Sequence, residues 1–141
     1  MKLRLLAALA LLVVSGAAAL AANYAAMRQA ILDHYAAQVR KTDPAFKGFS
    51  AAAGRAFFLA HPGTGRPATP SCTTCHTTNP KNPGRTRAGK TILPVAVSVT
   101  PSRFTRLHKV EKWFWRNCHT VYGRACTPLE KGNYITFMAS Q

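Results

Sequence analysis

Acidic side chains are scarce in this sequence, which contains four Asp and Glu residues against 19 Lys and Arg residues. The formal net charge is +15 over 141 residues. So strong a positive charge favours anionic partners. Three kinds fit the charge: an acidic protein, an anionic membrane surface and nucleic acid.

Strand-rich stretches and internal repeats are also missing. Their absence argues against an all-β fold and against a repeat array. The length suits one domain, and the apolar residues recur at helical spacing. We therefore expect an all-α fold. The predicted helices are residues 23–40, residues 51–60, residues 109–122 and a C-terminal helix that begins after position 127.

Residue types that begin and end helices stand at the expected places. Ser50 is a suitable N-cap for the second predicted helix. Gly123 follows the third helix, where glycine readily takes a left-handed conformation. Thr127, Pro128 and Glu130 have the spacing of a capping box with proline in the first helical position.

Residues 79–103 show no helical pattern and are rich in proline, glycine and basic residues. We expect a long irregular segment there, with a short extended piece at Ile92 to Val99. A loop of this length in a small domain usually serves a function, such as wrapping around a large ligand.

The first 21 residues are typical of a secretory signal peptide. A short basic start precedes an apolar run from Leu5 to Val14, and Ala19 to Ala21 offers a small-residue cleavage site. We expect cleavage near Ala21 and a periplasmic protein. The alternative is an uncleaved membrane anchor with the domain facing the periplasm. Export also removes nucleic acid from the expected partners.

Cysteine is rare as well, and two of the four cysteines lie within one short motif, Cys72-Thr73-Thr74-Cys75-His76. A Cys-x-x-Cys-His sequence is the attachment signal for c-type haem. The two thiols, Cys72 and Cys75, add to the two vinyl groups of the porphyrin. His76 then supplies the proximal nitrogen ligand to the iron. We therefore predict one covalent haem c.

Two other uses of such a motif fit less well. A zinc site needs a second ligand pair at matching spacing, whereas Cys118 and Cys126 lie eight residues apart. A thioredoxin-like site needs a strand followed by a helix, whereas residues rich in proline and threonine surround this motif. Because export implies an oxidising compartment, we expect Cys118 and Cys126 to form a disulfide.

The predicted helix over residues 109–122 carries a candidate for the sixth iron ligand. One stripe of this helix contains a single polar residue, Asn117. The apolar members of the stripe are Val110, Trp113, Phe114 and Val121. A buried amide without a partner costs roughly 1–3 kcal/mol, so Asn117 needs a partner, and the iron is one candidate. We expect Trp113 and Phe114 to lie beside the haem and exclude water.

The sequence also allows other assignments of the sixth iron ligand. Asn117 could instead bond to backbone or water. His119 is a stronger ligand but lies near the opposite face of the same helix. Met138 lies four residues after Tyr134, a spacing that favours core packing. Either His119 or Met138 would be a permanent strong ligand and would indicate a plain electron-transfer cytochrome.

Several motifs together resemble one known family, the sphaeroides haem protein (SHP) type of class I cytochrome c. They are CTTCH, GRTRAGK, PSRFT, KVEKWFWRNC and GRACTP, and the similarity covers about Phe49 to Ala139. The resemblance implies His76 as the proximal ligand and Asn117 as a weak distal ligand that leaves on reduction. The open ferrous iron then binds oxygen, nitric oxide and similar small molecules. It also implies a disulfide between Cys118 and Cys126.

The resemblance further implies electron partners, namely a dihaem cytochrome c and a membrane cytochrome b. With it, the domain prediction is a signal peptide at residues 1–21, an N-terminal helix and linker at residues 22–48, and a class I cytochrome c-like haem domain at residues 49–141. We expect a monomer that transfers electrons and binds gases rather than an enzyme, because a peroxidase would need His108 or His119 as an acid–base group facing the haem.

Overall fold

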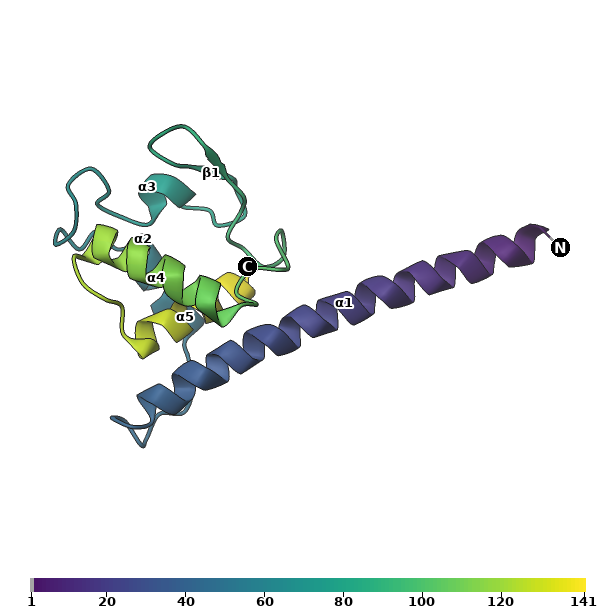
Figure 1. The fold of residues 1–141 in the computed structure, drawn as a ribbon, viewed down its shortest axis with the longest axis horizontal. Helices are drawn as coiled ribbons and strands as arrows, with labels where there is room; N and C mark the ends of the chain where they lie inside the picture. The colour runs from purple at the N-terminus through teal and green to yellow at the C-terminus, as the bar shows by residue number, and fades with distance from the viewer. Residues whose placement is uncertain (1) are drawn as a thin grey trace.

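The computed structural model describes the backbone of residues 2–141 and the side chains of residues 16–141. It is mostly helical, which confirms the expected fold class (Figure 1). The helices are α1 (Lys2–Val39), α2 (Ala51–Leu59), α3 (Thr73–His76), α4 (Leu107–Tyr122) and α5 (Pro128–Ala139). Two short antiparallel strands, β1 (Gly84–Arg85) and β2 (Thr91–Ile92), pair Gly84 with Ile92 and Arg85 with Thr91.

Some sequence expectations differ from these bounds. The expected extended piece at Ile92 to Val99 is wrong beyond Ile92, because residues 96–99 turn back on themselves and the amide of Val99 bonds to the carbonyl of Ala96. The single turn α3 was not expected at all. The first helix ends at Val39, but it begins far before Asn23.

The predicted signal peptide over residues 1–21 lies mostly outside the residues whose side chains are described. In the part of the chain that the structure describes, no helix combines the length and hydropathy needed to cross a membrane.

The expected helix ends are confirmed by their hydrogen bonds. The side chain of Ser50 accepts a bond from the amide of Ala53. Gly123 ends α4 with a φ of +66°, a left-handed value that favours glycine. Thr127 and Glu130 form the reciprocal capping box at the start of α5.

The centre of the domain is the crossing of α2 and α5. Phe58 is fully buried there, with its ring 5.9 Å from that of Phe137 and 6.1 Å from that of Tyr134. Gly54 lies at the closest approach, where a β-carbon would lie 2.6 Å from the carbonyl carbon of Asn133 and 2.8 Å from the β-carbon of Phe137. Only glycine fits between these two backbones.

Gly54→Ala is expected to destabilise the protein by about 3 kcal/mol, the upper part of the range for overpacking, because the added methyl group meets backbone rather than a flexible side chain. Thermal unfolding followed by circular dichroism measures the loss. Ala53→Ser is the matched control, since Ala53 is exposed on the same helix. A melting temperature equal to that of the control would contradict the close packing described here.

The second half of α1 is bound to the domain. Tyr35 is fully buried, and its hydroxyl donates to Glu111 of α4 at 2.5 Å. The ammonium of Lys131 in α5 pairs with the same carboxylate at 2.8 Å and lies 5.4 Å from the centre of the Tyr35 ring. Helix α1, which lies outside the α2–α5 crossing, is therefore joined to both α4 and α5.

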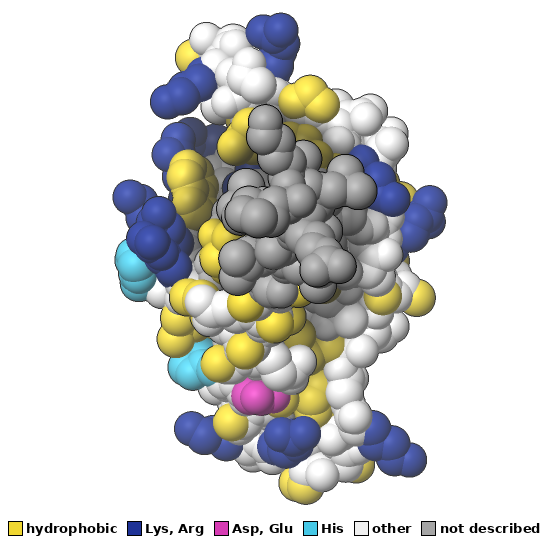
Figure 2. All heavy atoms as spheres, turned by 90° about the vertical axis from the view of Figure 1, so that its right-hand side faces the viewer, with side chains coloured by type: hydrophobic (Ala, Val, Ile, Leu, Met, Phe, Trp, Pro, Cys, Tyr) yellow, Lys and Arg dark blue, Asp and Glu magenta, His cyan; other side chains and the backbone are white. Residues whose placement is uncertain are grey.

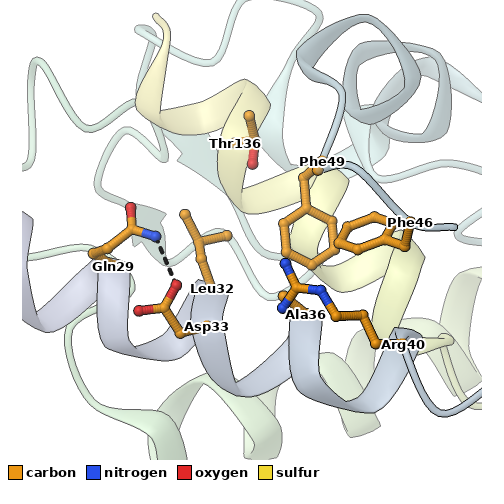
Figure 3. Close-up of a pocket in the computed structure, with 9 residues that line it drawn as sticks. Gln29, Leu32, Asp33, Ala36, Arg40, Phe46, Phe49 and Thr136 are labelled. Atoms are coloured by element: carbon orange, nitrogen blue, oxygen red, sulfur yellow. Dashed lines mark hydrogen bonds between the residues drawn. The ribbon is translucent and has the colours of Figure 1, made fainter. Parts of the chain in front are cut away.

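A cavity of about 230 Å³ lies between α1, the linker and α5 (Figure 3). Its lining residues are Gln29, Leu32, Asp33, Ala36, Arg40, Phe46, Gly48, Phe49 and Thr136. None of them is a predicted haem residue.

Figure 2 shows Lys and Arg side chains around the rim of one face, on which acidic side chains are rare.

Candidate functional site

The Cys-x-x-Cys-His motif forms one helical turn. The amides of Cys75 and His76 both bond to the carbonyl of Cys72, at 3.3 and 3.1 Å. Ser71, which is buried, accepts a 3.0 Å bond from the hydroxyl of Thr73 and so supports the start of the turn. Residues three and four apart on a helix lie on the same side. Both thiols and the imidazole of His76 therefore gather on one side of α3.

The two cysteines of this turn are free thiols and partly buried. Burial raises the pKa of Cys72 to about 11, so that this thiol is neutral at neutral pH. The chemistry of thioether formation needs two such unpaired thiols at one edge of the porphyrin. Cys72 and Cys75 fit this requirement.

His76 is held as a neutral imidazole. Burial, together with the positive charge of Arg103, lowers the pKa of His76 to about 4. A neutral imidazole is the form that binds a metal. The donor set of α3 therefore fits a covalently attached haem with a proximal histidine.

One segment of the irregular region lies against α3, and a second is bonded to the chain a few residues after it. A β-carbon on Gly84 would lie 3.0 Å from the carbonyl carbon of Cys75 and 3.1 Å from the α-carbon of His76. The carbonyl of Pro80 accepts bonds from the amides of Val95 and Ala96, at 3.1 and 3.0 Å. The long segment after the motif thus packs against the backbone of α3 at Gly84 and turns back on itself at Val95 and Ala96.

The buried face of α4 differs from the stripe that was expected from the sequence. Val110, Phe114 and Val121 are buried as expected, but Trp113 is 51 % exposed and Asn117 is exposed. The physical reason is Cys118. It is 3 % exposed, one turn beyond Phe114, and its bond to Cys126 draws that row of the helix into the core. The list of buried residues of α4 is Val110, Phe114, Cys118, Val121 and Tyr122.

The three expected haem neighbours on α4 therefore lie on two faces. Trp113 and Asn117 are one turn apart on the same face. Phe114 points into the core, with its ring 5.5 Å from that of Tyr134 and 5.9 Å from the ammonium of Lys131. Trp113 is thus the aromatic neighbour of Asn117 on the exposed face of α4. Phe114 packs on the core-facing side of the helix.

The two alternative sixth ligands have other contacts. The Nδ1 atom of His119 lies 2.5 Å from the carbonyl oxygen of Trp115, and the two rings are 4.9 Å apart. Met138 is fully buried in the hydrophobic core.

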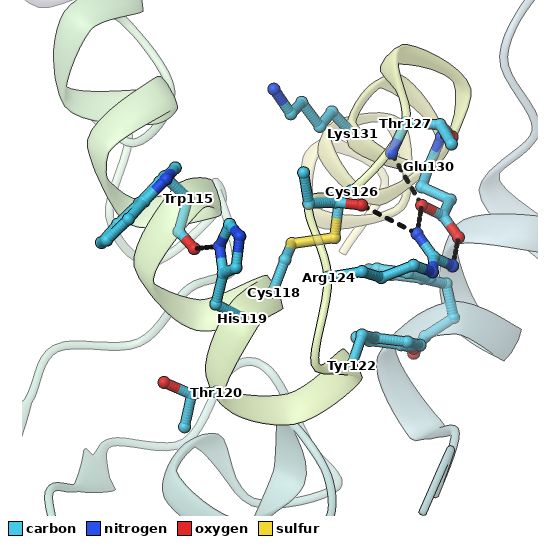
Figure 4. Close-up of a disulfide and its surroundings, with 12 residues drawn as sticks. Trp115, Cys118, His119, Thr120, Tyr122, Arg124, Cys126, Thr127, Glu130 and Lys131 are labelled. Carbon is cyan, nitrogen blue, oxygen red and sulfur yellow. Dashed lines mark hydrogen bonds and ion pairs between the residues drawn. A yellow bond between two sulfur atoms is a disulfide. The ribbon is translucent and has the colours of Figure 1, made fainter. Parts of the chain in front are cut away.

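The end of α4 is fixed from several sides (Figure 4). A disulfide joins Cys118 to Cys126, whose α-carbons are 5.7 Å apart. Arg124 forms two bonds to the carboxylate of Glu130, at 2.8 and 2.6 Å. On the other side, the amide of Arg66 donates to the carbonyl of Thr120 at 2.8 Å. These contacts hold the turn of helix that carries Asn117.

Among the residues that the structure describes, no three His, Cys, Asp or Glu side chains come together as a metal site. The zinc alternative for the motif therefore has no second ligand pair in the described part of the chain.

A Cys-x-x-Cys-His turn set into a small helical domain defines a class I c-type cytochrome. Residues 44–138 match a family described as a domain of unknown function (DUF1924). The cytochrome c-type protein SHP of Cereibacter sphaeroides is 48 % identical over 110 residues, which cover 71 % of this chain and 85 % of that protein. Cytochrome c'' of Methylophilus methylotrophus is 35 % identical over 100 residues, covering 70 % of this chain and 69 % of that protein.

Solved structures of the same two relatives also match this chain. Oxidized SHP, described as an oxygen-binding cytochrome c, superimposes with a TM-score of 0.72 at 43 % identity, covering 81 % of this chain and 96 % of that one. Oxidized cytochrome c'' superimposes with a TM-score of 0.71 at 30 % identity, covering 82 % and 95 %. The chain therefore belongs to the SHP family of c-type cytochromes, and its cofactor is the covalent haem c of that class.

Proposed function

We propose that this protein is an exported cytochrome that transfers electrons and binds small diatomic ligands such as oxygen or nitric oxide. The observation that carries the proposal is the position of Asn117. It shares with Trp113 a face of α4 that is not used for core packing. One relative with a solved structure is described as oxygen-binding.

Each residue of the site has a distinct task in this proposal. Cys72 and Cys75 hold the cofactor through two thioether bonds, and His76 is the proximal ligand. The haem would supply an iron that changes between ferric and ferrous states, and His76 and Asn117 would be its protein ligands. Asn117 offers a neutral amide oxygen on the distal side, and Trp113 excludes water from it.

An amide oxygen is a hard donor, so Asn117 binds a ferric ion better than a ferrous one. Asn117 would therefore hold a ferric haem iron more firmly than a ferrous one, which would leave the reduced cofactor open to a small ligand. The disulfide and the Arg124–Glu130 pair keep the helix in place while the side chain moves. The release then requires only a side-chain rotation rather than a change of fold.

Export and redox partners belong to the same proposal. The high positive charge suits acidic electron donors and acceptors. A dihaem cytochrome c and a membrane cytochrome b are the partners that we propose, and we place the protein in the periplasm.

Visible spectra of the purified protein test the proposal. We expect a six-coordinate low-spin spectrum in the ferric state, a five-coordinate high-spin spectrum in the ferrous state, and full conversion to a carbon monoxide adduct when that gas is added. A low-spin ferrous spectrum that carbon monoxide leaves unchanged would instead indicate a plain electron carrier, with His119 or Met138 as a permanent ligand.

A further inference from the structure

Trp115 is a large apolar side chain on the surface of α4. It is 67 % exposed, more than any other large apolar side chain that the structure describes. The side chain is nevertheless held in place, because its ring lies 4.9 Å from the ring of His119 (Figure 4). The Nδ1 atom of His119 in turn lies 2.5 Å from the carbonyl oxygen of Trp115. A side chain that is already ordered loses little entropy when a partner covers it.

Trp115 belongs to one row of side chains along α4. The row follows the helix at spacings of four, three and four residues and consists of His108, Lys112, Trp115 and His119. At about 100° per residue, these side chains lie within about 60° of one another around the helix axis. Each of them is exposed. We call this row the outer face of α4.

The outer face is separate from the face that carries the proposed distal ligand. Trp115 stands two residues from both Trp113 and Asn117, so it lies about 160° from each of them around the helix axis. An α-helix with its side chains is about 10–12 Å across. A partner on the outer face is therefore separated from the proposed distal side of the haem site by about the thickness of one helix.

The outer face is positively charged, and the row itself contains no carboxylate. Lys112 lies on it, and Arg116 stands beside it one turn further along. The acidic residues of the chain are Asp33, Asp43, Glu111 and Glu130. Of these, only Glu111 belongs to α4, and its carboxylate pairs with Lys131 at 2.8 Å and accepts the hydroxyl of Tyr35 at 2.5 Å. The charge of Glu111 is thus used inside the fold.

A tryptophan beside two cations fits an acidic protein better than it fits other occupants. Trp and Arg are enriched among the residues that dominate the energy of protein interfaces, and complementary charge speeds the encounter. A second copy of this chain carries the same positive charge and is repelled. A membrane surface takes up a helix through its apolar face, whereas the apolar face of α4 is used in the core.

We propose that the outer face of α4 is the docking surface for an acidic redox protein, with Trp115 as the central contact and Lys112 and Arg116 as the cations that orient the partner. The inference rests on the proposed electron-transfer function and adds the surface through which electrons arrive or leave. In the encounter one electron passes from the reduced partner to the ferric haem, and no bond is made or broken.

Stopped-flow reduction of the haem-loaded ferric protein tests this inference. The probe is a reduced plant-type ferredoxin, an acidic iron–sulfur protein whose low potential drives the transfer. At low ionic strength, Lys112→Glu is expected to lower the second-order rate constant about tenfold, because a repulsive charge replaces an attractive one. Salt at about 1 M should remove this difference by screening. Trp115→Ala is expected to raise the half-saturating ferredoxin concentration about fivefold, as for a central interface contact.

The matched controls are Arg55→Glu, a charge reversal at an exposed position of α2, and Leu129→Ala, which shortens an exposed apolar side chain of α5. Both should change the rates less than twofold. Rates for Lys112→Glu and Trp115→Ala equal to those of these controls would overturn the inference. If Trp115→Ala then also abolishes binding to phosphatidylglycerol vesicles, the outer face is a membrane contact instead.

Two further results separate this inference from the proposed function. A wild-type protein that dithionite reduces but ferredoxin does not would overturn the docking surface alone. A low-spin ferrous spectrum of the wild type would overturn the gas-binding proposal alone, because the rate differences between the variants would still be measurable.

Discussion

Asn117→His is expected to close the distal position of the ferrous protein. An imidazole remains a good ligand when the iron is reduced, whereas an amide oxygen does not. If the new histidine occupies the position about 99 % of the time, the apparent affinity for carbon monoxide falls about 100-fold, because only the remaining fraction is competent to bind. Carbon monoxide titration of the ferrous protein, followed by visible absorption, measures the change.

Arg116→His is the matched control for this experiment. It adds an imidazole to the neighbouring position of the same helix, but Arg116 lies about 100° away around the helix axis. Carbon monoxide affinity should stay at the wild-type value in this control. An Asn117→His variant that still binds the gas with wild-type affinity would show that residue 117 does not face the iron.

The local signals of the sequence were sufficient for most helix ends. Ser50, Gly123 and the capping box at Thr127 each use a short-range hydrogen bond or a backbone preference that depends on nearby residues only. The Cys-x-x-Cys-His motif is also a local signal, since five consecutive residues supply both thiols and the histidine. Such features can be predicted without knowledge of the fold.

The orientation of α4 could not be predicted in the same way. Helical periodicity gave a stripe centred on Asn117, whereas the buried row runs through Phe114 and Cys118. The difference is set by the partner of Cys118, which lies beyond the end of the helix at Cys126. Trp113 and Asn117, which are one turn apart, therefore lie on an exposed face of α4 rather than in the core.

Long-range bonds account for what the sequence did not indicate. Arg28 contacts carbonyl groups 73 and 75 residues away, and nothing in the pattern of α1 marks it as different from the surrounding polar residues. Its acceptors are backbone carbonyl groups, which every residue type has, so the sequence does not identify them. Short-range patterns therefore do not specify how the irregular segment is held against α1.

Replacing both cysteines of the motif is expected to have the largest effect of all. In the variant with Cys72→Ala and Cys75→Ala, no thioether bond can form, so acidified organic solvent should extract all of the haem. The wild-type protein should release none. Absorption of the extract and of the protein pellet measures the two fractions. His76 alone would hold the cofactor reversibly.

The other cysteine pair provides the control, because Cys118→Ala with Cys126→Ala removes the same number of sulfur atoms. That variant should keep its haem fully bound and lose about 2.5 kcal/mol of stability, the loop-closure contribution of a short disulfide. Extraction of haem from the control, or retention in the motif variant, would contradict the assignment. Because one pair forms thioether bonds to the haem and the other forms a disulfide, the comparison separates attachment of the cofactor from stabilisation of the fold.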